Sequence, residues 1–317
     1  MIIVTGGAGF IGSNLVKELN RRGRTDIVVV DNLTHGQKAL NLTDCIIADY
    51  HDKEDFRDLI EADAHLGPVE AVFHMGACSA TTEWDGRYIM RNNFAYTREL
   101  FHWCQDRRIP FIYASSAAVY GGNDTFREEP AHERPLNAYG YSKLAFDQYL
   151  RRHMDSLTAQ VVGLRYFNVY GPREGYKGGM ASVIHHFSNQ LREGNTVRLF
   201  EGCDGYADGE QRRDLVDVRD CVNLKLWLLE HPEVNGIYNC GTGRARTFND
   251  MARATIDWFG RGEIEYIPFP DHLKGRYQSY TQADLSQLRA AGCDLKFHDI
   301  EDGVRAYLDA VAADQAD

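Results

Sequence analysis

The sequence has no apolar run of the roughly 18–20 residues that a membrane-spanning helix needs. It also lacks a block of lysine and arginine: 46 acidic residues outnumber 35 basic ones, and the formal net charge is −11. Nucleic-acid binding requires clustered cations that neutralise phosphates. We therefore expect neither a membrane nor a nucleic-acid partner.

The cysteines form no recognisable pattern. There are seven, with no CxxC pair and no Cys/His spacing typical of a metal site. The first residues, MIIVTGGAGF, lack the basic start, apolar core and cleavage site of a signal peptide. We therefore expect reduced thiols, no bound metal and a cytoplasmic location.

What the first half of the chain does contain is an alternation of short apolar runs and helix-like segments. The runs lie at 2–5, 27–31, 45–49, 71–77, 111–116 and 161–166, and the main helix-like segments at 11–23, 53–64 and 93–107. Most runs are continuous, as expected of strands buried on both faces. This alternation predicts an α/β fold with a Rossmann-type, doubly wound parallel sheet.

The pattern changes after residue 167, where a Gly-rich stretch (172–179) and a polar loop (202–214) appear. We predict two domains. A dinucleotide-binding Rossmann domain covers residues 1–167, and segments near 214–243 return to it. A smaller mixed α/β substrate domain covers residues 168–317.

A glycine-rich turn, TGGAGFIGS, follows the first predicted strand and opens the first helix. Gly6 permits a tight turn, Gly9 lets backbone N–H groups approach a pyrophosphate, and Gly12 lets the helix pack closely on the strand. A Gly-rich turn without a ligand is the alternative. Asp31 ends the second strand 19 residues after Gly12, near the acidic position that contacts a ribose, which favours a dinucleotide.

The choice between NAD and NADP stays open from these residues alone. Asp31 favours the free ribose hydroxyls of NAD. Lys38 and Lys53 each follow a strand end, where a cation can meet the additional phosphate of NADP. Each could equally be an ordinary surface lysine.

Tyr139 stands four residues before Lys143 in NAYGYSKLAFDQY, so the two side chains share a helix face. Tyrosine is a poor base at its usual pKa of about 10, and a nearby ammonium lowers that pKa. Tyr141 points elsewhere and is expected to pack. Ser116, at the end of the fifth predicted strand, is placed to hydrogen-bond a reacting hydroxyl. A chance Tyr/Lys pair on a solvated face and a strand-capping serine are the alternatives.

The GxxGxxG spacing resembles the short-chain dehydrogenase/reductase superfamily, and Ser116, Tyr139 and Lys143 match the serine–tyrosine–lysine set of its extended branch. Nucleotide-sugar dehydratases of this superfamily usually carry an Asp–Glu pair beside the serine. Here the neighbours are Ala117 and Ala118, so dehydration is disfavoured, and epimerisation or simple redox chemistry remains.

Four further segments resemble ADP-glycero-manno-heptose 6-epimerases: GACSATTEWDG (76–86), RYFNVYGPREGYKGGMAS (165–182), RLFEG (198–202) and PFPDHLKGRYQSYTQADL (268–285). The resemblance extends from Met1 nearly to the C-terminus. It implies interconversion of ADP-D-glycero- and ADP-L-glycero-manno-heptose at the sixth heptose carbon, for the lipopolysaccharide inner core. It also implies tightly held NADP, a cytoplasmic location and a homo-oligomer, typically a homopentamer.

The same resemblance implies roles for individual residues. Tyr139 acts as acid/base and Lys177 as a second base, with Ser116 and Lys143 assisting. Besides Gly6, Gly9 and Gly12, the residues expected to bind the cofactor are Phe10, Ile11, Asp31, Asn32, Lys38, Lys53, Met75, Gly76, Ala77, Cys78, Ser79, Asn92, Lys143, Val169 and Lys177. Those expected to bind the substrate are Asn168, Gly179, His186, Phe200, Glu201, Gly202, Cys203, Arg213 and Tyr277.

The sequence departs from the family pattern in three places. Gly179 and Cys203 stand where relatives often have serine, and the loop from Cys203 to Arg213 is longer than expected, which leaves Arg212 as an alternative to Arg213. The rival functions are another nucleotide-sugar epimerase or reductase, such as a UDP-hexose 4-epimerase, and a non-catalytic dinucleotide-sensing protein.

Overall fold

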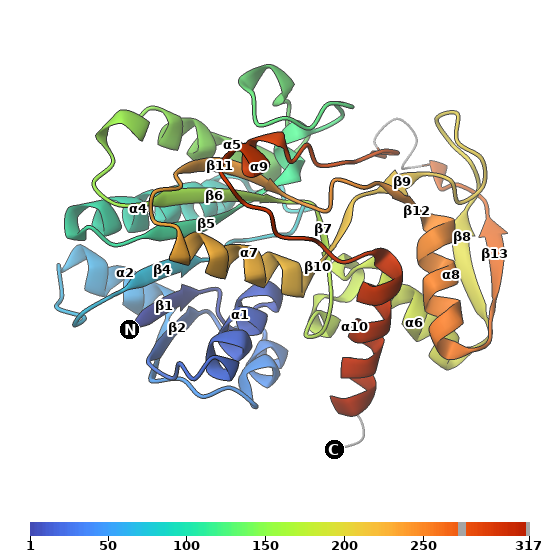
Figure 1. Ribbon diagram of the computed structural model, residues 1–317, viewed down its shortest axis with the longest axis horizontal. Coiled ribbons are helices and arrows are strands. Elements are labelled where there is room, and N and C mark those ends of the chain that lie inside the picture. The colour runs from blue at the N-terminus through green and yellow to red at the C-terminus, as the bar shows by residue number, and fades with distance from the viewer. Residues whose placement is uncertain (272–276, 315–317) are drawn as a thin grey trace.

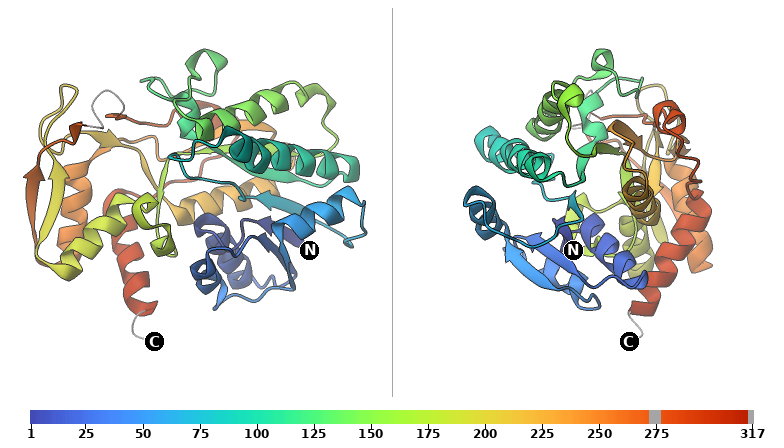
Figure 2. Two further views of the ribbon diagram at one scale, coloured as in Figure 1. Left: turned by 180° about the vertical axis from the view of Figure 1, so that it is seen from behind. Right: turned by 60° about the vertical axis from the view of Figure 1, so that its left-hand side comes forward.

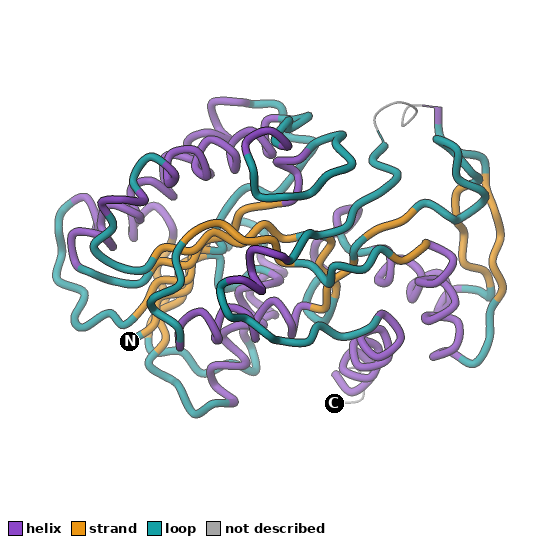
Figure 3. The backbone as a smooth tube through the Cα atoms, turned by 45° about the horizontal axis from the view of Figure 1, so that its top comes forward, coloured by secondary structure: helices purple, strands orange, loops and turns teal. Residues whose placement is uncertain are grey.

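A seven-stranded parallel sheet forms the centre of the computed structural model, which describes residues 1–271 and 277–314. The strand order is β11-β6-β5-β4-β1-β2-β3, and Figure 3 shows the strands side by side with helices on both sides. The order reverses between β1 and β4, and such sheets bind ligands beyond the carboxyl ends of the strands at this point. The predicted fold class is therefore confirmed. The strands are β1 (Ile2–Thr5), β2 (Ile27–Asp31), β3 (Asp49–Asp52), β4 (Ala71–His74), β5 (Phe111–Ser116), β6 (Val161–Tyr166) and β11 (Gly236–Cys240).

Helices cover both faces of this sheet (Figure 1). On one face α1 (Phe10–Arg21), α7 (Val218–Glu230) and α9 (Ser286–Ala290) contribute to one hydrophobic core. On the other, α2 (Lys53–Glu61), α4 (Tyr96–Arg107) and α5 (Ala138–Arg151) contribute to a second. Burial on both faces explains why the strand sequences are continuously apolar.

The third strand lies later than predicted. Residues 45–48 of the predicted run are not in a strand, and β3 is the polar segment Asp49–Asp52. β3 is an edge strand that pairs only with β2, so it needs no continuous apolar sequence. The backbone of Ile46 is occupied elsewhere: its N–H donates to Asn20 Oδ1 (2.7 Å) and its carbonyl accepts from Asn20 Nδ2 (2.8 Å).

The other predicted elements agree closely with the structure, with one informative exception. The runs at 2–5, 27–31, 111–116 and 161–166 are strands with these bounds, whereas the run at 71–77 ends as a strand at His74. The helix predicted at 93–107 begins as α4 only at Tyr96, because residues 93–95 belong to a π-helical segment, η2 (Met90–Ala95), which follows α3 (Gly86–Ile89). Such π segments often occur at functional sites, and this one carries Asn92.

A second unit lies beyond the carboxyl ends of the strands (Figure 2). There α6 (Val183–Glu193), α8 (Phe248–Phe259) and α10 (Ile300–Asp314) share a core with the parallel pair β8 (Thr196–Phe200) and β13 (Glu263–Ile267). Two short pairs connect the units: β7 (Asn168–Tyr170) with β10 (Leu215–Asp217), and β9 (Arg212–Arg213) with β12 (Arg246–Thr247). The division near residue 167 stays a prediction, although β11 returns to the main sheet.

Short helical turns complete the described chain. They are η1 (Gly36–Leu42), η3 (Ala117–Tyr120), η4 (Pro130–His132), η5 (Met154–Ser156) and η6 (Gly175–Met180). Across residues 1–271 and 277–314, no helix combines the length and the hydropathy needed to cross a membrane.

Candidate active site

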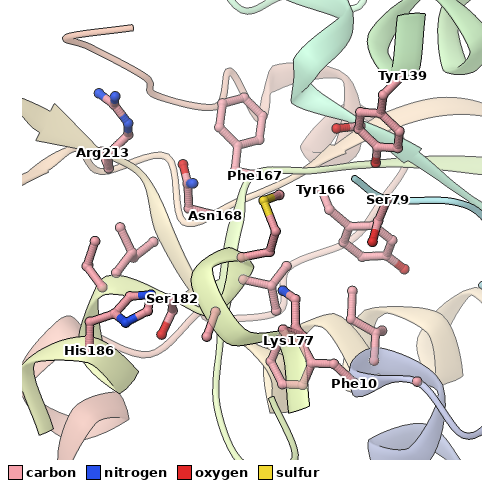
Figure 4. A pocket seen from close by; sticks show the side chains of 18 of the residues that line it. Phe10, Ser79, Tyr139, Tyr166, Phe167, Asn168, Lys177, Ser182, His186 and Arg213 are labelled. Atoms are coloured by element: carbon pink, nitrogen blue, oxygen red, sulfur yellow. The ribbon is translucent and has the colours of Figure 1, made fainter. Parts of the chain in front are cut away.

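A cavity of about 660 Å³ lies between the sheet and the second unit. Its walls combine the glycine turn, the ends of β5 and β6, and residues of η6, α6 and β8. A smaller cavity of about 200 Å³ adjoins it at Gly6, Lys38 and Ala77. Figure 4 shows Tyr139, Ser79 and Tyr166 on one side of the large cavity and Arg213 and His186 on the other. Lys177 lies between them.

The glycine turn is shaped so that a side chain would not fit. Gly6 has φ of +66°, and a Cβ there would lie 2.6 Å from the backbone nitrogen of Gly76. A Cβ on Gly12 would lie 2.1 Å from the carbonyl oxygen of Gly6. Gly9 caps α1 without a side-chain hydrogen bond, so no capping side chain blocks the positive N-terminus of the helix, where Phe10 N–H donates to the Tyr176 hydroxyl (3.0 Å). This cradle fits the pyrophosphate of a dinucleotide.

The small cavity collects the residues expected at the adenosine end of that dinucleotide. Asp31 is buried, and its carboxylate accepts hydrogen bonds from Ala8 N–H (2.9 Å) and from the Lys38 ammonium. Lys53 donates to Asn92 Oδ1 (2.6 Å), which places a second cation at the same cavity. An acid for ribose hydroxyls and two cations for a phosphate therefore face one space.

Tyr139 and Lys143 lie on the same side of α5, whose N-terminus is capped by Asn137. Burial raises the pKa of the Tyr139 phenol, and a hydrogen bond with Ser116 acts in the opposite direction. The expected lowering of this pKa by Lys143 is not seen. The Lys143 ammonium, only 4% exposed, donates instead to the Ala114 carbonyl oxygen (2.7 Å), and burial lowers its own pKa to about 8.

The prediction that Tyr141 packs is wrong. Its side chain is 56% exposed, because it projects from α5 on the side away from the sheet. It does point away from the cavity, as the helical spacing predicted.

Lys177 reaches the large cavity from η6. Its ammonium lies 5.1 Å from the centre of the Phe10 ring, and burial lowers its pKa while the negative charge of Glu174 opposes that change. No cation among the described residues contributes to this lowering of the Lys177 pKa. The Glu174 carboxylate accepts hydrogen bonds from Ser182 N–H (2.6 Å) and Ser182 Oγ–H (2.7 Å), which closes the base of the loop.

The structure distinguishes between the two candidate arginines. Arg213 is buried in the cavity wall, and its guanidinium stacks 4.8 Å from the ring centre of Tyr277 and 5.7 Å from that of Phe248. Arg212 is exposed. The neighbouring histidines divide in the same way: His186 lines the cavity, whereas His185 bonds Tyr307 and Asn189.

Most of the predicted site residues line one of the two cavities, but four do not. Gly179, Glu201, Gly202 and Cys203 are absent from both walls. Gly179 is exposed with open space around it. After Phe200 the chain turns away: Glu201 N–H donates to Ile267 O (2.8 Å) and Gly202 N–H to Asp208 Oδ1 (2.8 Å). Residues 272–276 of the predicted segment 268–285 lie outside the described residues.

The structure also adds lining residues that the sequence analysis missed. No local motif marks them, although Tyr176 adjoins Lys177 and Tyr166 ends a predicted strand. They include Tyr166, Tyr176, Gln190, Gln211 and Phe248 in the large cavity and Thr34 and Tyr88 in the small one. Over the part of the chain that the structure describes, no three His, Cys, Asp or Glu side chains are grouped to hold a metal ion.

The fold and this site define a nicotinamide dinucleotide-binding protein of the short-chain dehydrogenase/reductase type. A family model described as the NAD dependent epimerase/dehydratase family matches residues 2–241, and the chain belongs to this family. An ADP-L-glycero-D-manno-heptose-6-epimerase from Alkalilimnicola ehrlichii is 84% identical over 312 residues, which are 98% of each chain.

Two solved structures extend the comparison. The ADP-L-glycero-D-manno-heptose-6-epimerase of Helicobacter pylori is 29% identical, with a TM-score of 0.81 over 98% of this chain and 96% of its own. A UDP-glucose 4-epimerase from Thermotoga maritima, solved with UDP-glucose, is 28% identical, with a TM-score of 0.81 over 99% of both chains. The shared fold therefore does not distinguish between these two sugar substrates.

Proposed function

We propose that this protein interconverts ADP-D-glycero- and ADP-L-glycero-manno-heptose at the sixth heptose carbon, in the cytoplasm, for the lipopolysaccharide inner core. The observation that carries the proposal is the 84% identity, over 98% of both chains, to the Alkalilimnicola ehrlichii epimerase. By family resemblance it works as a homo-oligomer, a homopentamer.

The site contains the groups that such a reaction needs. A bound nicotinamide dinucleotide would supply the hydride acceptor and donor that this reaction needs. Tyr139 removes the proton of the reacting hydroxyl, and Ser116, which hydrogen-bonds the phenol, orients that hydroxyl. Buried Lys143 contributes a positive charge near the site and holds the cofactor ribose.

Inversion of one carbon requires the hydride to leave one face and return to the other, so the oxidised sugar must present both faces. Its oxygen then points in two directions, and one fixed phenol is not within hydrogen-bonding distance of both positions. Lys177 serves as the second acid/base. Its lowered pKa, which results from burial, favours this role because it brings the neutral amine closer to the working pH.

NADP is the proposed cofactor. Lys38 and Lys53 face the small cavity together, and two cations near one phosphate offset repulsion by Asp31. The Lys38–Asp31 contact already neutralises part of that carboxylate charge.

The cavity wall that carries Arg213 and His186, opposite Tyr139, is the far wall, and it binds the rest of the substrate. Buried Arg213, held between two aromatic rings, supplies a cation for the substrate pyrophosphate. Asn168, His186, Phe200 and Tyr277 line the same space and complete the sugar and nucleotide contacts.

The test is incubation of the purified protein with each ADP-heptose epimer and, separately, with UDP-glucose. Either ADP-heptose epimer should give the same equilibrium mixture of both, and UDP-glucose should stay unchanged. Conversion of UDP-glucose with inert ADP-heptose would support a UDP-hexose 4-epimerase, the alternative that the Thermotoga maritima similarity favours. No turnover of any nucleotide sugar would support a dinucleotide-sensing protein.

A further inference from the structure

Tyr176 lies over the phosphate cradle although it comes from the opposite side of the cavity. It belongs to η6, and its hydroxyl oxygen accepts a hydrogen bond from Phe10 N–H (3.0 Å). Phe10 is the first residue of α1, so this N–H has no partner within the helix. A Cβ built on Gly9 would lie 3.5 Å from the same hydroxyl. A side chain of η6 thus contacts the main chain at the start of α1.

The hydroxyl of Tyr176 still has a proton to donate. A tyrosine hydroxyl is both donor and acceptor, and no acceptor for its proton occurs among residues 1–271 and 277–314. The residue lines the large cavity. Accepting an N–H at the positive end of a helix polarises the hydroxyl and strengthens it as a donor. Burial raises the pKa of the phenol, which keeps it protonated.

The loop that carries Tyr176 is held in place on both sides. Asn14 Nδ2 of α1 donates to the Pro172 carbonyl (2.9 Å), and the Arg173 guanidinium pairs with Asp44 (2.7 Å). At its other end the Glu174 carboxylate binds Ser182. Because the loop is already ordered, a new hydrogen bond from Tyr176 costs little additional conformational entropy.

We propose that Tyr176 binds the pyrophosphate of the dinucleotide, donating its hydroxyl proton to a phosphate oxygen while it accepts the N–H of Phe10. Since Lys177 is the next residue, the same contact fixes the loop that supplies the second acid/base to the bound cofactor. This inference rests on the dinucleotide part of the proposed function and is independent of which sugar is the substrate.

The test is the substitution Tyr176→Phe, which removes the hydroxyl and keeps the ring. Affinities for NAD, NADP and ADP-ribose, which all contain the pyrophosphate, are measured by displacement titration without a sugar nucleotide. Adenosine 2′-monophosphate, which lacks the pyrophosphate, reports any effect of the substitution on the adenosine end of the site. Removal of a hydrogen bond to a charged phosphate predicts that affinity falls by about tenfold or more, equally for the three pyrophosphate ligands. The affinity for adenosine 2′-monophosphate should stay unchanged. Tyr141→Phe, at an exposed tyrosine, is the matched control.

Three results would overturn the proposal: unchanged affinities, tighter binding of all three ligands, or weaker binding of NADP alone. Tighter binding would mean that the hydroxyl competes with the pyrophosphate for Phe10 N–H. A loss confined to NADP would place Tyr176 at the adenosine phosphate. Because no sugar is present, failure of the ADP-heptose assay would not alter any of these outcomes.

Discussion

The two walls of the large cavity differ in whether main-chain groups or side chains face the ligand. On the cofactor side the glycine turn presents backbone beside the proposed catalytic side chains: Gly6 and Gly12 leave no room for a Cβ, and the N-terminus of α1 faces the cavity. On the far side the surface is made of side chains, chiefly Arg213 held between Phe248 and Tyr277. A ligand that enters between them meets fixed main-chain dipoles at the glycine turn and replaceable side chains on the far side.

We infer that family members share the backbone cradle and differ in the side chains of the far wall. A backbone cradle depends on a small number of glycines and on strand geometry, so it varies little in shape. Side chains can be exchanged without altering the fold. The Helicobacter pylori and Thermotoga maritima enzymes, named for different sugars, accordingly match this chain with the same TM-score of 0.81.

The largest expected effect is at Tyr139, on the cofactor side of the cavity. Tyr139→Phe should reduce epimerisation by at least about 100-fold, because it removes the proposed general acid/base, and it should leave cofactor affinity unchanged. Initial rates with each epimer and a cofactor titration test this. Tyr141→Phe is the control and should be nearly silent, since Tyr141 is exposed outside the cavity. The reverse pattern would assign the reaction to the other phenol.

Lys177, which lies between the two walls, tests whether a residue outside the cofactor wall contributes chemistry as well as binding. Lys177→Met should retain fold and cofactor but lose interconversion by at least about 100-fold. It should still oxidise one epimer through Tyr139, so single-turnover oxidation of the two epimers, measured separately, should become unequal. Equal rates from both epimers, or near-normal epimerisation, would rule out the two-base scheme.

Arg213 tests the side-chain character of the far wall. Arg213→Gln should raise KM for the nucleotide sugar by roughly 10–100-fold, because it removes the proposed charge-assisted contact with the substrate pyrophosphate, and should not change cofactor affinity. Arg212→Gln is the matched control: this neighbour is exposed and should have little effect. Equal effects of the two substitutions would contradict the assignment.

The cofactor wall was predictable from sequence because its residues lie in short segments at strand ends. The glycine turn after β1, Asp31 at the end of β2 and Ser116 at the end of β5 all fall where the parallel-sheet topology places ligand contacts. Every residue predicted to contact the cofactor lines one of the two cavities.

The far wall was less predictable because it depends on loop paths. Glu201, Gly202 and Cys203 follow Phe200 directly, yet their backbone hydrogen bonds direct the chain away from the cavity until Gln211 and Arg213 return. Phe248 and Tyr176 are distant in sequence from the groups they contact, and no local pattern encodes such pairings. The displaced edge strand β3 has the same origin, since the Asn20 side chain takes the Ile46 backbone groups.

The smallest expected effect concerns Lys38, a side chain on the cofactor side of the site. Lys38→Ala should weaken NADP binding by about tenfold and leave NAD binding nearly unchanged, because only NADP carries the additional phosphate and Lys53 still provides a cation at the small cavity. Removal of Lys38 also frees the Asp31 carboxylate, which repels a phosphate and accepts ribose hydroxyls, so the preference should shift towards NAD. Parallel titrations with both dinucleotides measure the ratio, and Lys17→Ala, at a surface lysine paired with Asp44, is the control. An unchanged ratio would remove Lys38 from the phosphate site and leave Asp31 as the determinant, with NAD as the cofactor.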